Sequence, residues 1–240
     1  MDMHTDPLMT RLGATELKQL SPLSDPQVVE RILDGDVGAF ELLMRRYNQR
    51  LFIAARSVLE RDADAEDALQ ETYLRAFQSL RGFEGRSAIS TWLTRIAINE
   101  ALRLRERNTR LGRLHGSDHA LQAAVTGNSK MFAATTRNED QGRLEEALAT
   151  LNDNERTIVM LRLIHGLSTH EVAECTQLSE SNVKVILHRT RIKLANTLTK
   201  NSCDQLRHEL SFDGARCDRI VERVFASLPR STSSKSEHRQ

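Results

Sequence analysis

The amino-acid sequence predicts an all-α protein with two small helical domains, a flexible linker between them and a short helical C-terminal extension. Only 4 of the 240 residues are Pro, 11 are Gly and 4% are aromatic, whereas an all-β sandwich or barrel needs turn signals about every 8–12 residues. Apolar residues recur at steps of three and four, which is a helical period. A hydrophobic fraction of 39% is sufficient for a core. The length suits one large domain or two small ones of roughly 100–150 residues each.

Changes in composition divide the chain into five segments. The first is polar and contains Pro7 and Pro22, so we expect a flexible N-terminal arm. The second and fourth are helical domains, and the third, rich in Gly, Asn, Ser and Thr, is expected to be a linker. The fifth is an extension with one or two short helices before a polar tail. In chain order, the segments are residues 1–24, 25–107, 108–139, 140–200 and 201–240.

Within the first domain, one stretch shows the helical period clearly. Its apolar stripe consists of Ala65, Leu69, Tyr73, Ala76 and Leu80. The opposite face carries acidic residues at helical steps, namely Asp64, Asp67 and Glu71. We therefore expect an amphipathic helix that buries one face and presents carboxylates on the other.

The net charge of +1 conceals segments of opposite charge. Residues 60–71 hold six acidic residues and one Arg, a net charge of −5, and residues 81–113 hold eight Arg and three acidic residues, a net charge of +5. Each could be a solvated surface, and an Arg-rich helix end suits the helix dipole. Two opposed patches in one small domain nevertheless predict two partners, a basic protein surface and a polyanion.

Between these segments lies a loop of small polar residues with an aromatic residue at each end, Phe83 and Trp92. Such a loop can accept an unstacked base, because polar groups read the base edge while nearby arginines hold the strand. Both aromatic rings could equally be core anchors that shape the loop without stacking on a base.

The second domain contains a predicted helix-turn-helix. Asn152 with Glu155 and Ser168 with Glu171 have the spacing of capping boxes, and Gly166 ends the helix that precedes the second box. A short helix over 168–175 is followed by a turn at Gln177 and Leu178, and Ser179 caps a longer helix that runs to about Lys200. This order of short helix, turn and long helix is typical of DNA-binding domains.

The long helix has an apolar stripe, Val183, Leu187, Thr190, Leu194 and Leu198, which would pack on the bundle. Residues 179–200 hold five basic residues and one acidic residue, a net charge of +4. Cations on one face can meet phosphates, and the first turn can reach base edges in the major groove. The alternative is an amphipathic surface helix with a solvated basic side.

Other function classes find little support. The three cysteines are too few and too scattered for a disulfide framework. Cys203, His208 and Cys217 fit no standard zinc spacing, so we expect ordinary thiols, no metal site and no cofactor.

No apolar run approaches the roughly 18 residues needed to span a bilayer, and the N-terminus lacks the features of a signal peptide. We therefore expect a cytoplasmic protein without membrane insertion.

Two long stretches resemble bacterial sigma factors of the extracytoplasmic-function group, within the sigma-70 family. Residues 64–77, DAEDALQETYLRAF, and 83–99, FEGRSAISTWLTRIAIN, are similar to region 2 of that family. Three further stretches are similar to region 4, namely LATLNDNER at 148–156, GLSTHEVA at 166–173 and NVKVILHRTR at 182–191. The resemblance implies a non-enzymatic sigma factor that binds core RNA polymerase, through its largest and second-largest subunits, and directs promoter-specific initiation. An anti-sigma factor is a further candidate partner.

The resemblance also assigns residues to roles. Docking to the polymerase would use Asp64, Asp67, Gln70 and Glu71. Melting of the −10 element and capture of a flipped base would use Phe83, Arg86, Ser87, Ser90, Trp92, Arg95, Asn99 and Arg103. The −35 duplex would be read by Ser181, Asn182, Lys184, Val185, His188, Arg189 and Arg191. The linker would thread through the polymerase toward its active-site and RNA-exit channels. Ile186 replaces an Arg that is frequent in the family, which leaves the −35 preference open.

Two competing functions remain. A conventional regulator would bind duplex operators through the helix-turn-helix and use residues 25–107 for sensing or dimerisation, but the acidic helix and the polar-aromatic loop have no role in it. A metal or thiol enzyme could use Cys203, His208, Cys217 and the Asp64/Asp67 pair, but the sequence lacks the Glu-x-x-His partners of helical metal sites. The extension over 201–240 receives no function from the sequence.

Overall fold

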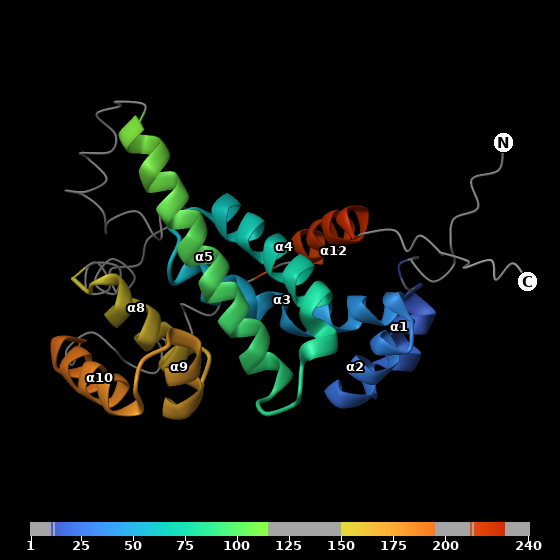
Figure 1. The fold of residues 1–240 in the computed structure, drawn as a ribbon, viewed down its shortest axis with the longest axis horizontal. Helices are drawn as coiled ribbons and strands as arrows, with labels where there is room; N and C mark the ends of the chain where they lie inside the picture. The colour runs from blue at the N-terminus through green and yellow to red at the C-terminus, as the bar shows by residue number, and fades with distance from the viewer. Residues whose placement is uncertain (1–10, 12, 115–149, 195–211, 213, 229–240) are drawn as a thin grey trace, which may run out of the picture.

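The computed structural model describes residues 11, 13–114, 150–194, 212 and 214–228, and every regular element in these ranges is helical (Figure 1). The predicted all-α class is confirmed. The α-helices are α1 (Ala14–Leu20), α2 (Asp25–Leu33), α3 (Phe40–Arg56), α4 (Asp62–Ser79), α5 (Ile89–Leu114), α8 (Asp153–Val159), α9 (Thr169–Thr176), α10 (Glu180–Leu194) and α12 (Gly214–Ser227). Short 3-10 turns form at Val37–Ala39 and Leu80–Gly82, and a π-helical segment at Met160–Ile164 follows α8.

Helices α3, α4 and α5 pack together as the first domain, because each carries an apolar face. The predicted stripe on α4, from Ala65 to Leu80, is buried throughout. Phe40 of α3 meets Tyr73 and Phe77 of α4 edge to face, with ring centroids 6.0 and 5.3 Å apart, an arrangement that aromatic rings favour. The buried hydroxyl of Tyr73 donates a hydrogen bond to the Met44 carbonyl at 3.2 Å. This buried hydroxyl therefore has a hydrogen-bond partner, as buried polar groups require.

The structure corrects two predicted boundaries. The arm over 1–24 is not loose where it is described, because Ala14–Leu20 forms α1 and the Leu20 side chain is buried. The linker does not begin at residue 108, because α5 continues to Leu114. The predicted second domain is described only from residue 150 to residue 194, so Leu198 and Lys200 lie outside the described part. Residues 115–139 of the predicted linker also lie outside it.

The second domain has the predicted helix-turn-helix. Asn152 Oδ1 accepts from the Glu155 N–H at 2.9 Å, and Ser168 Oγ accepts from the Glu171 N–H at 3.2 Å. In both boxes the glutamate side chain accepts from the cap N–H in return. Ser179 Oγ accepts from the Asn182 N–H at 3.2 Å and caps α10. All three caps that the sequence predicted are therefore confirmed.

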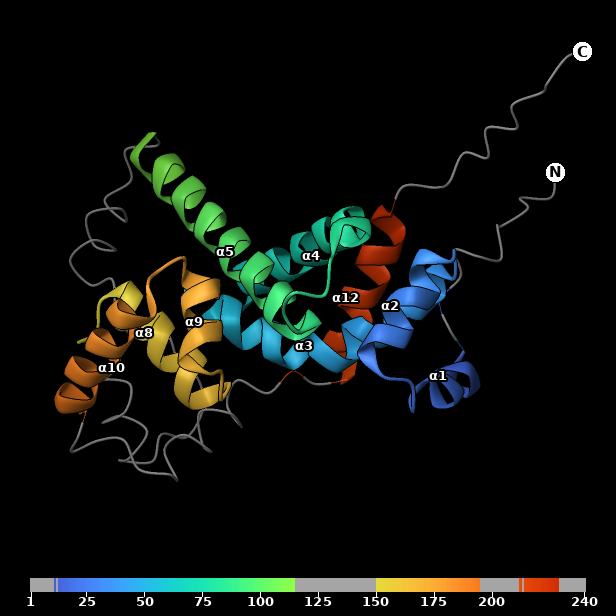
Figure 2. The same ribbon diagram turned by 60° about the horizontal axis from the view of Figure 1, so that its bottom comes forward.

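The two domains pack against each other through α9 and the start of α5 (Figure 2). The Thr91 hydroxyl donates to Glu171 Oε1 at 2.8 Å, and the Cys175 thiol lies 3.7 Å from the Thr91 carbonyl. Farther along α5, Arg105 pairs with Asp153 at 2.6 Å. Burial raises the pKa of the Glu171 carboxyl, but hydrogen bonds from Ser168 and Thr91 hold it below its ordinary value. Glu171 is therefore ionised at neutral pH and is a strong acceptor for Thr91.

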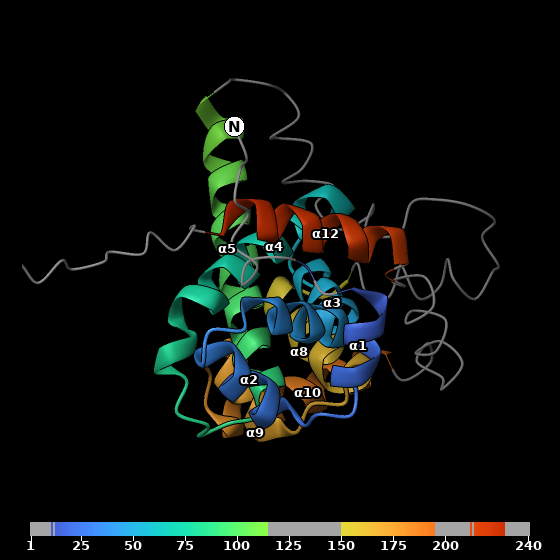
Figure 3. The ribbon, with the colours of Figure 1, turned by 90° about the vertical axis from the view of Figure 1, so that its right-hand side faces the viewer.

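Helix α12 lies across α3 and α4 on the far side of the first domain from α9 and α10 (Figures 2 and 3). The prediction of a short helix in the C-terminal extension is confirmed for Gly214–Ser227. Within the described part of the chain, no helix is both long and apolar enough to cross a membrane.

We expect the Cys175 thiol to resist alkylation in the folded protein. Its side chain is buried, and burial raises its pKa to about 12, so almost none of the reactive thiolate exists at pH 8. Treatment with iodoacetamide, followed by peptide mass spectrometry, should leave Cys175 unmodified under native conditions and modify it in guanidinium chloride. Rapid native modification would show that α9 separates from α5.

Candidate nucleic-acid interface and acidic docking face

The acidic face of α4 presents its carboxylates unequally. The side chains of Asp67 and Glu71 are 64% and 48% exposed, whereas that of Asp64 is only 17% exposed and pairs with Arg61 at 3.4 Å. Gln70 is half-buried between these positions. The four residues predicted for docking therefore lie on one helix, but Asp67 and Glu71 offer most of the accessible negative charge.

A groove of about 500 Å³ separates this acidic face from α5. It is lined from α4 by Asp67, Ala68, Gln70, Glu71 and Arg75 and from α5 by Glu100, Arg103, Leu104 and Arg107. Three residues predicted for polymerase docking thus lie across one groove from Arg103, which is predicted for the −10 element. The sequence pattern placed them in separate segments and gave no sign of this.

Glu100 links the two walls of the groove. Its side chain is only 6% exposed and pairs with Arg75 at 2.9 Å and with Arg103 at 2.7 Å. Arg75 also pairs with Glu71 at 3.1 Å. A chain of ion pairs therefore runs from Glu71 on the acidic face to Arg103 on the basic face. Sequence reasoning missed Arg75 and Glu100; only the three-residue step from Glu100 to Arg103 is visible in the sequence.

The substitution Glu100→Gln is expected to lower the free energy of unfolding by about 1–2 kcal/mol. It weakens charge-assisted hydrogen bonds to two arginines, but both guanidinium groups remain partly in water, which limits the loss. Urea unfolding followed by circular dichroism measures the change. Glu106→Gln, at an exposed position on the same helix, is the control and should leave stability unchanged. Equal stability of both variants would mean that the ion-pair chain contributes nothing.

The loop between α4 and α5 is anchored by its aromatic ends. The Phe83 and Trp92 rings lie 5.2 Å apart at an angle of 50°, and both are half-buried against the core. Gly85 has φ of +69°, a conformation that favours glycine. The structure thus supports the anchor interpretation for both rings. Both side chains nevertheless remain partly exposed.

The remaining residues predicted for the −10 element line the loop and the outer face of α5. Arg86, Arg95 and Arg103 are exposed, and Ser87, Ser90 and Asn99 are half-buried. Arg86 also pairs with the exposed Glu84 at 2.9 Å. The eight predicted residues therefore run from the loop along one helix, cations outermost, which suits a strand whose phosphates face solvent.

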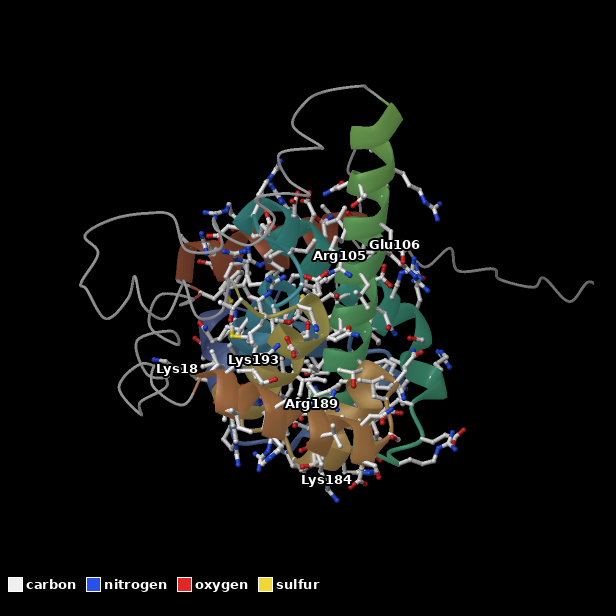
Figure 4. The ribbon with its side chains drawn as sticks, turned by 90° about the vertical axis from the view of Figure 1, so that its left-hand side faces the viewer. Lys18, Arg105, Glu106, Lys184, Arg189 and Lys193 are labelled. Carbon is white, nitrogen blue, oxygen red and sulfur yellow. The ribbon has the colours of Figure 1, made fainter. Side chains whose placement is uncertain are left out.

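Helix α10 separates its faces as predicted. Its apolar stripe is buried at Val183, Leu187, Thr190 and Leu194. All residues predicted to contact the −35 element are exposed, namely Ser181, Asn182, Lys184, Val185, His188, Arg189 and Arg191. Figure 4 shows Lys184, Arg189 and Lys193 along the length of this helix. Val185, 47% exposed, is one of the few large apolar side chains on the described surface.

Two side chains of α10 contact the rest of the domain, although the Lys193 side chain remains 46% exposed. Ile186 is half-buried and packs against the core, so the position at which the resemblance led us to expect Arg is turned inward here. Lys193 pairs with Glu155 at 2.7 Å. Burial raises the pKa of the Glu155 carboxyl, but the hydrogen bond from Lys193 brings it below its ordinary value. The basic surface of α10 therefore begins at Lys184 and ends near Arg191.

Metal ligands do not gather in the described part of the chain, where no group of three or more His, Cys, Asp or Glu could hold an ion. Cys203 and His208 of the weighed zinc set lie outside the described residues. Cys217 accepts a hydrogen bond from Asn48 Nδ2 at 2.9 Å within the contact between α12 and α3.

Comparison with known proteins matches both domains. The model of sigma-70 region 2 matches residues 43–111, and that of sigma-70 region 4 matches residues 141–194. RNA polymerase sigma-H factor of Pseudomonas aeruginosa is 30% identical over 182 residues, which are 72% of this chain and 92% of that protein. The ECF RNA polymerase sigma factor SigX of Bacillus subtilis is 30% identical over 186 residues, 77% of this chain and 93% of that protein.

Among solved structures, CnrH in complex with the cytosolic domain of CnrY is similar, with a TM-score of 0.51 and 25% identity over 71% of this chain and 94% of that one. The order of the two matched regions, the helix-turn-helix and the extent of the relatives agree with one another. The chain belongs to the sigma-70 family, as an extracytoplasmic-function sigma factor that directs RNA polymerase to promoters.

Proposed function

We propose that the chain divides the work of a sigma factor among three surfaces. The acidic face of α4 docks core RNA polymerase, the loop at 83–92 with the outer face of α5 captures the −10 element, and α10 reads the −35 duplex. The observation that carries this proposal is that α10 has one exposed polar face and one buried apolar face. Every residue predicted to contact DNA there is exposed, while the apolar stripe of the same helix is buried.

Docking on the polymerase relies on Asp67 and Glu71, with smaller shares from Asp64 and Gln70. Exposed carboxylates attract a basic partner surface, and cations repel it. This attraction speeds association and sets the orientation in which the partner docks. The largest and second-largest polymerase subunits would supply that surface. The groove beside this face brings the bound polymerase close to Arg103.

Capture of the −10 element combines stacking with charge. Phe83 and Trp92, each partly exposed, shape a pocket for an unstacked base, and stacking of a base on an aromatic ring face is worth about 1–3 kcal/mol. Ser87, Ser90 and Asn99 offer hydrogen bonds to base edges, and the arginines at 86, 95 and 103 hold the single strand by its phosphates.

Reading of the −35 element uses the exposed face of α10 in the major groove. Arg189 and Arg191, with Lys184 and His188, contact phosphates or guanine edges, and the Val185 side chain suits the methyl group of thymine. Ile186, turned toward the domain, contributes packing rather than a DNA contact. Relatives with Arg at this position would therefore prefer different −35 sequences.

The chain is proposed to act without chemistry of its own, in the cytoplasm, where polymerase and promoters are found. Core polymerase provides the catalysis. A regulatory partner is also proposed: the similar CnrH is found in complex with the cytosolic domain of CnrY, and an anti-sigma factor would fit the same two-domain arrangement here.

Transcription in vitro tests the whole proposal. Purified chain and core polymerase are incubated with a library of promoter fragments, and transcripts are sequenced. We expect initiation at a defined set of promoters that share −35 and −10 elements, and none with core polymerase alone. Binding to duplex operators without any polymerase-dependent transcript would instead support a conventional helix-turn-helix regulator.

A further inference from the structure

The C-terminal helix α12 lies outside the two matched sigma regions, which end at residue 194. It is amphipathic with three distinct sides. An apolar stripe contains Ile220, Val221 and Val224, each fully buried. One flank carries Arg216, Arg219 and Arg223, and the other carries Asp218 and Glu222. Each side has its own partner in the first domain.

The arginine flank meets the acidic helix α4. Arg216 lies 2.5 Å from Asp62 and 3.4 Å from Glu66. Arg219 lies 3.7 Å from the same Glu66, and Arg223 lies 3.8 Å from Asp67. Three guanidinium groups, at steps of three and four, thus follow three carboxylates along α4. They compensate half of the six acidic residues between 60 and 71.

The acidic flank is held away from α4. Asp218 pairs with Arg45 at 2.7 Å, and Glu222 pairs with Arg11 at 3.0 Å. Phe212, just before the helix, packs on Phe52 with ring centroids 4.9 Å apart, and Arg216 lies over the same Phe52 ring at 5.2 Å. Because both flanks and the stripe are matched, α12 has one preferred orientation, with its cations toward the acidic face.

We propose that α12 occupies, within the chain, the acidic surface that core polymerase uses, and so lowers the affinity of the factor for polymerase. The inference rests on the proposed docking role of α4. Asp67 is shared directly: it is the most exposed of the proposed docking carboxylates and the partner of Arg223. A basic polymerase surface must meet Asp67, which Arg223 already pairs with, so the two occupants compete for this carboxylate.

The attachment of α12 is strong enough to place the helix and weak enough to be displaced. Arg219 and Arg223 are half-exposed, and ion pairs of this kind contribute little each. The buried stripe supplies most of the attachment, and the arginines supply the charge that competes. If polymerase binds only chains in which α12 has left α4, its apparent affinity is the intrinsic affinity multiplied by the fraction of such chains.

Charge reversal on α12 tests the competition in the full-length chain. Arg219→Glu with Arg223→Glu places like charges beside Glu66 and Asp67 and leaves the buried stripe intact. We expect binding to core polymerase, measured by fluorescence anisotropy, to tighten by at least about fivefold, at the lower end of typical coupling between sites. Lys18→Glu with Arg31→Glu, exposed cations on α1 and α2, is the charge-matched control and should bind as the wild type does.

The outcomes separate this inference from the proposed function. If the wild type binds polymerase and Asp67→Lys with Glu71→Lys does not, docking on α4 stands; unchanged or weaker binding by the α12 reversal then overturns the competition alone. If the wild type does not bind polymerase, both proposals fail. An equal gain in the control would assign the effect to net charge and overturn the competition.

Hydrogen exchange gives a second, independent measurement. When core polymerase binds the wild-type chain, amides of 214–227 are expected to lose protection by about fivefold or more, because α12 is displaced from α4. Protection that stays the same or increases would show that α12 remains in place and belongs to the docking surface, which would overturn the proposal.

Discussion

Reversal of charge at Asp67 and Glu71, by substitution with lysine, is expected to weaken binding to core RNA polymerase by roughly 100-fold or more. These two carboxylates are the most exposed of the predicted docking set, so reversal replaces attraction to a basic surface with repulsion. Asp64 is a poorer choice, because its side chain is largely covered and pairs with Arg61. Copurification and anisotropy titration with core polymerase measure the loss.

The control carries the same change of charge at a different place. Glu30→Lys with Asp34→Lys alters two exposed carboxylates on and just after α2. Exposed substitutions of this kind usually change stability by no more than about 0.5 kcal/mol, so circular dichroism should show both variants folded. Polymerase binding by the Asp67/Glu71 variant that equals that of the control would refute docking on α4.

Removal of the two arginines on the recognition helix, Arg189→Ala with Arg191→Ala, is expected to weaken binding to −35 duplex DNA and to reduce its dependence on salt. For each phosphate that the protein no longer neutralises, the slope of log K against log salt should flatten by about 0.9, so the double variant should show a slope shallower by about 1.8. Both side chains are exposed, and the buried stripe of α10 is untouched. Titration of the holoenzyme with labelled duplex at several salt concentrations gives the slope.

Lys18→Ala is the control for this experiment, because it removes an exposed cation from α1, which lies at the opposite end of the described structure from α10 (Figures 1 and 2). Its slope should equal that of the wild type. A slope for the arginine variant that also equals the wild-type slope would mean that Arg189 and Arg191 face solvent in the complex. Weaker affinity with an unchanged slope would assign them to neutral interactions with bases.

The caps and apolar stripes could be predicted because their physics is local. A capping box needs only Ser168, Glu171 and the backbone between them, and the stripe of α4 needs only a period of 3.6 residues. The same reasoning located the exposed face of α10, since the residues opposite a buried stripe must face water. The helix ends were predicted less well. Helix α5 continues past residue 107, where the linker was expected to begin, and Ala14–Leu20 is helical, where a flexible arm was expected.

Exposure within the candidate sites could not be predicted. Asp64 and Asp67 have the same chemistry and lie one helical turn apart, yet only Asp67 is largely in water. Ile186 is half-buried, although it follows the exposed Val185 on the basic helix. These differences depend on what packs beside each side chain, and the neighbours come from other helices.

By itself, the sequence determined the helices, their caps, the separation of charge into acidic and basic segments, and the family. Each of these depends on residues within a few turns of one another. Only the tertiary structure decided that Glu100 joins Arg75 to Arg103, that Thr91 meets Glu171, and that the arginines of α12 pair with Asp62, Glu66 and Asp67 of α4. Ion pairs and hydrogen bonds of this kind join distant parts of the chain, so no local pattern selects the partner. The buried apolar faces bring the helices together, and the charges at their edges meet as a consequence.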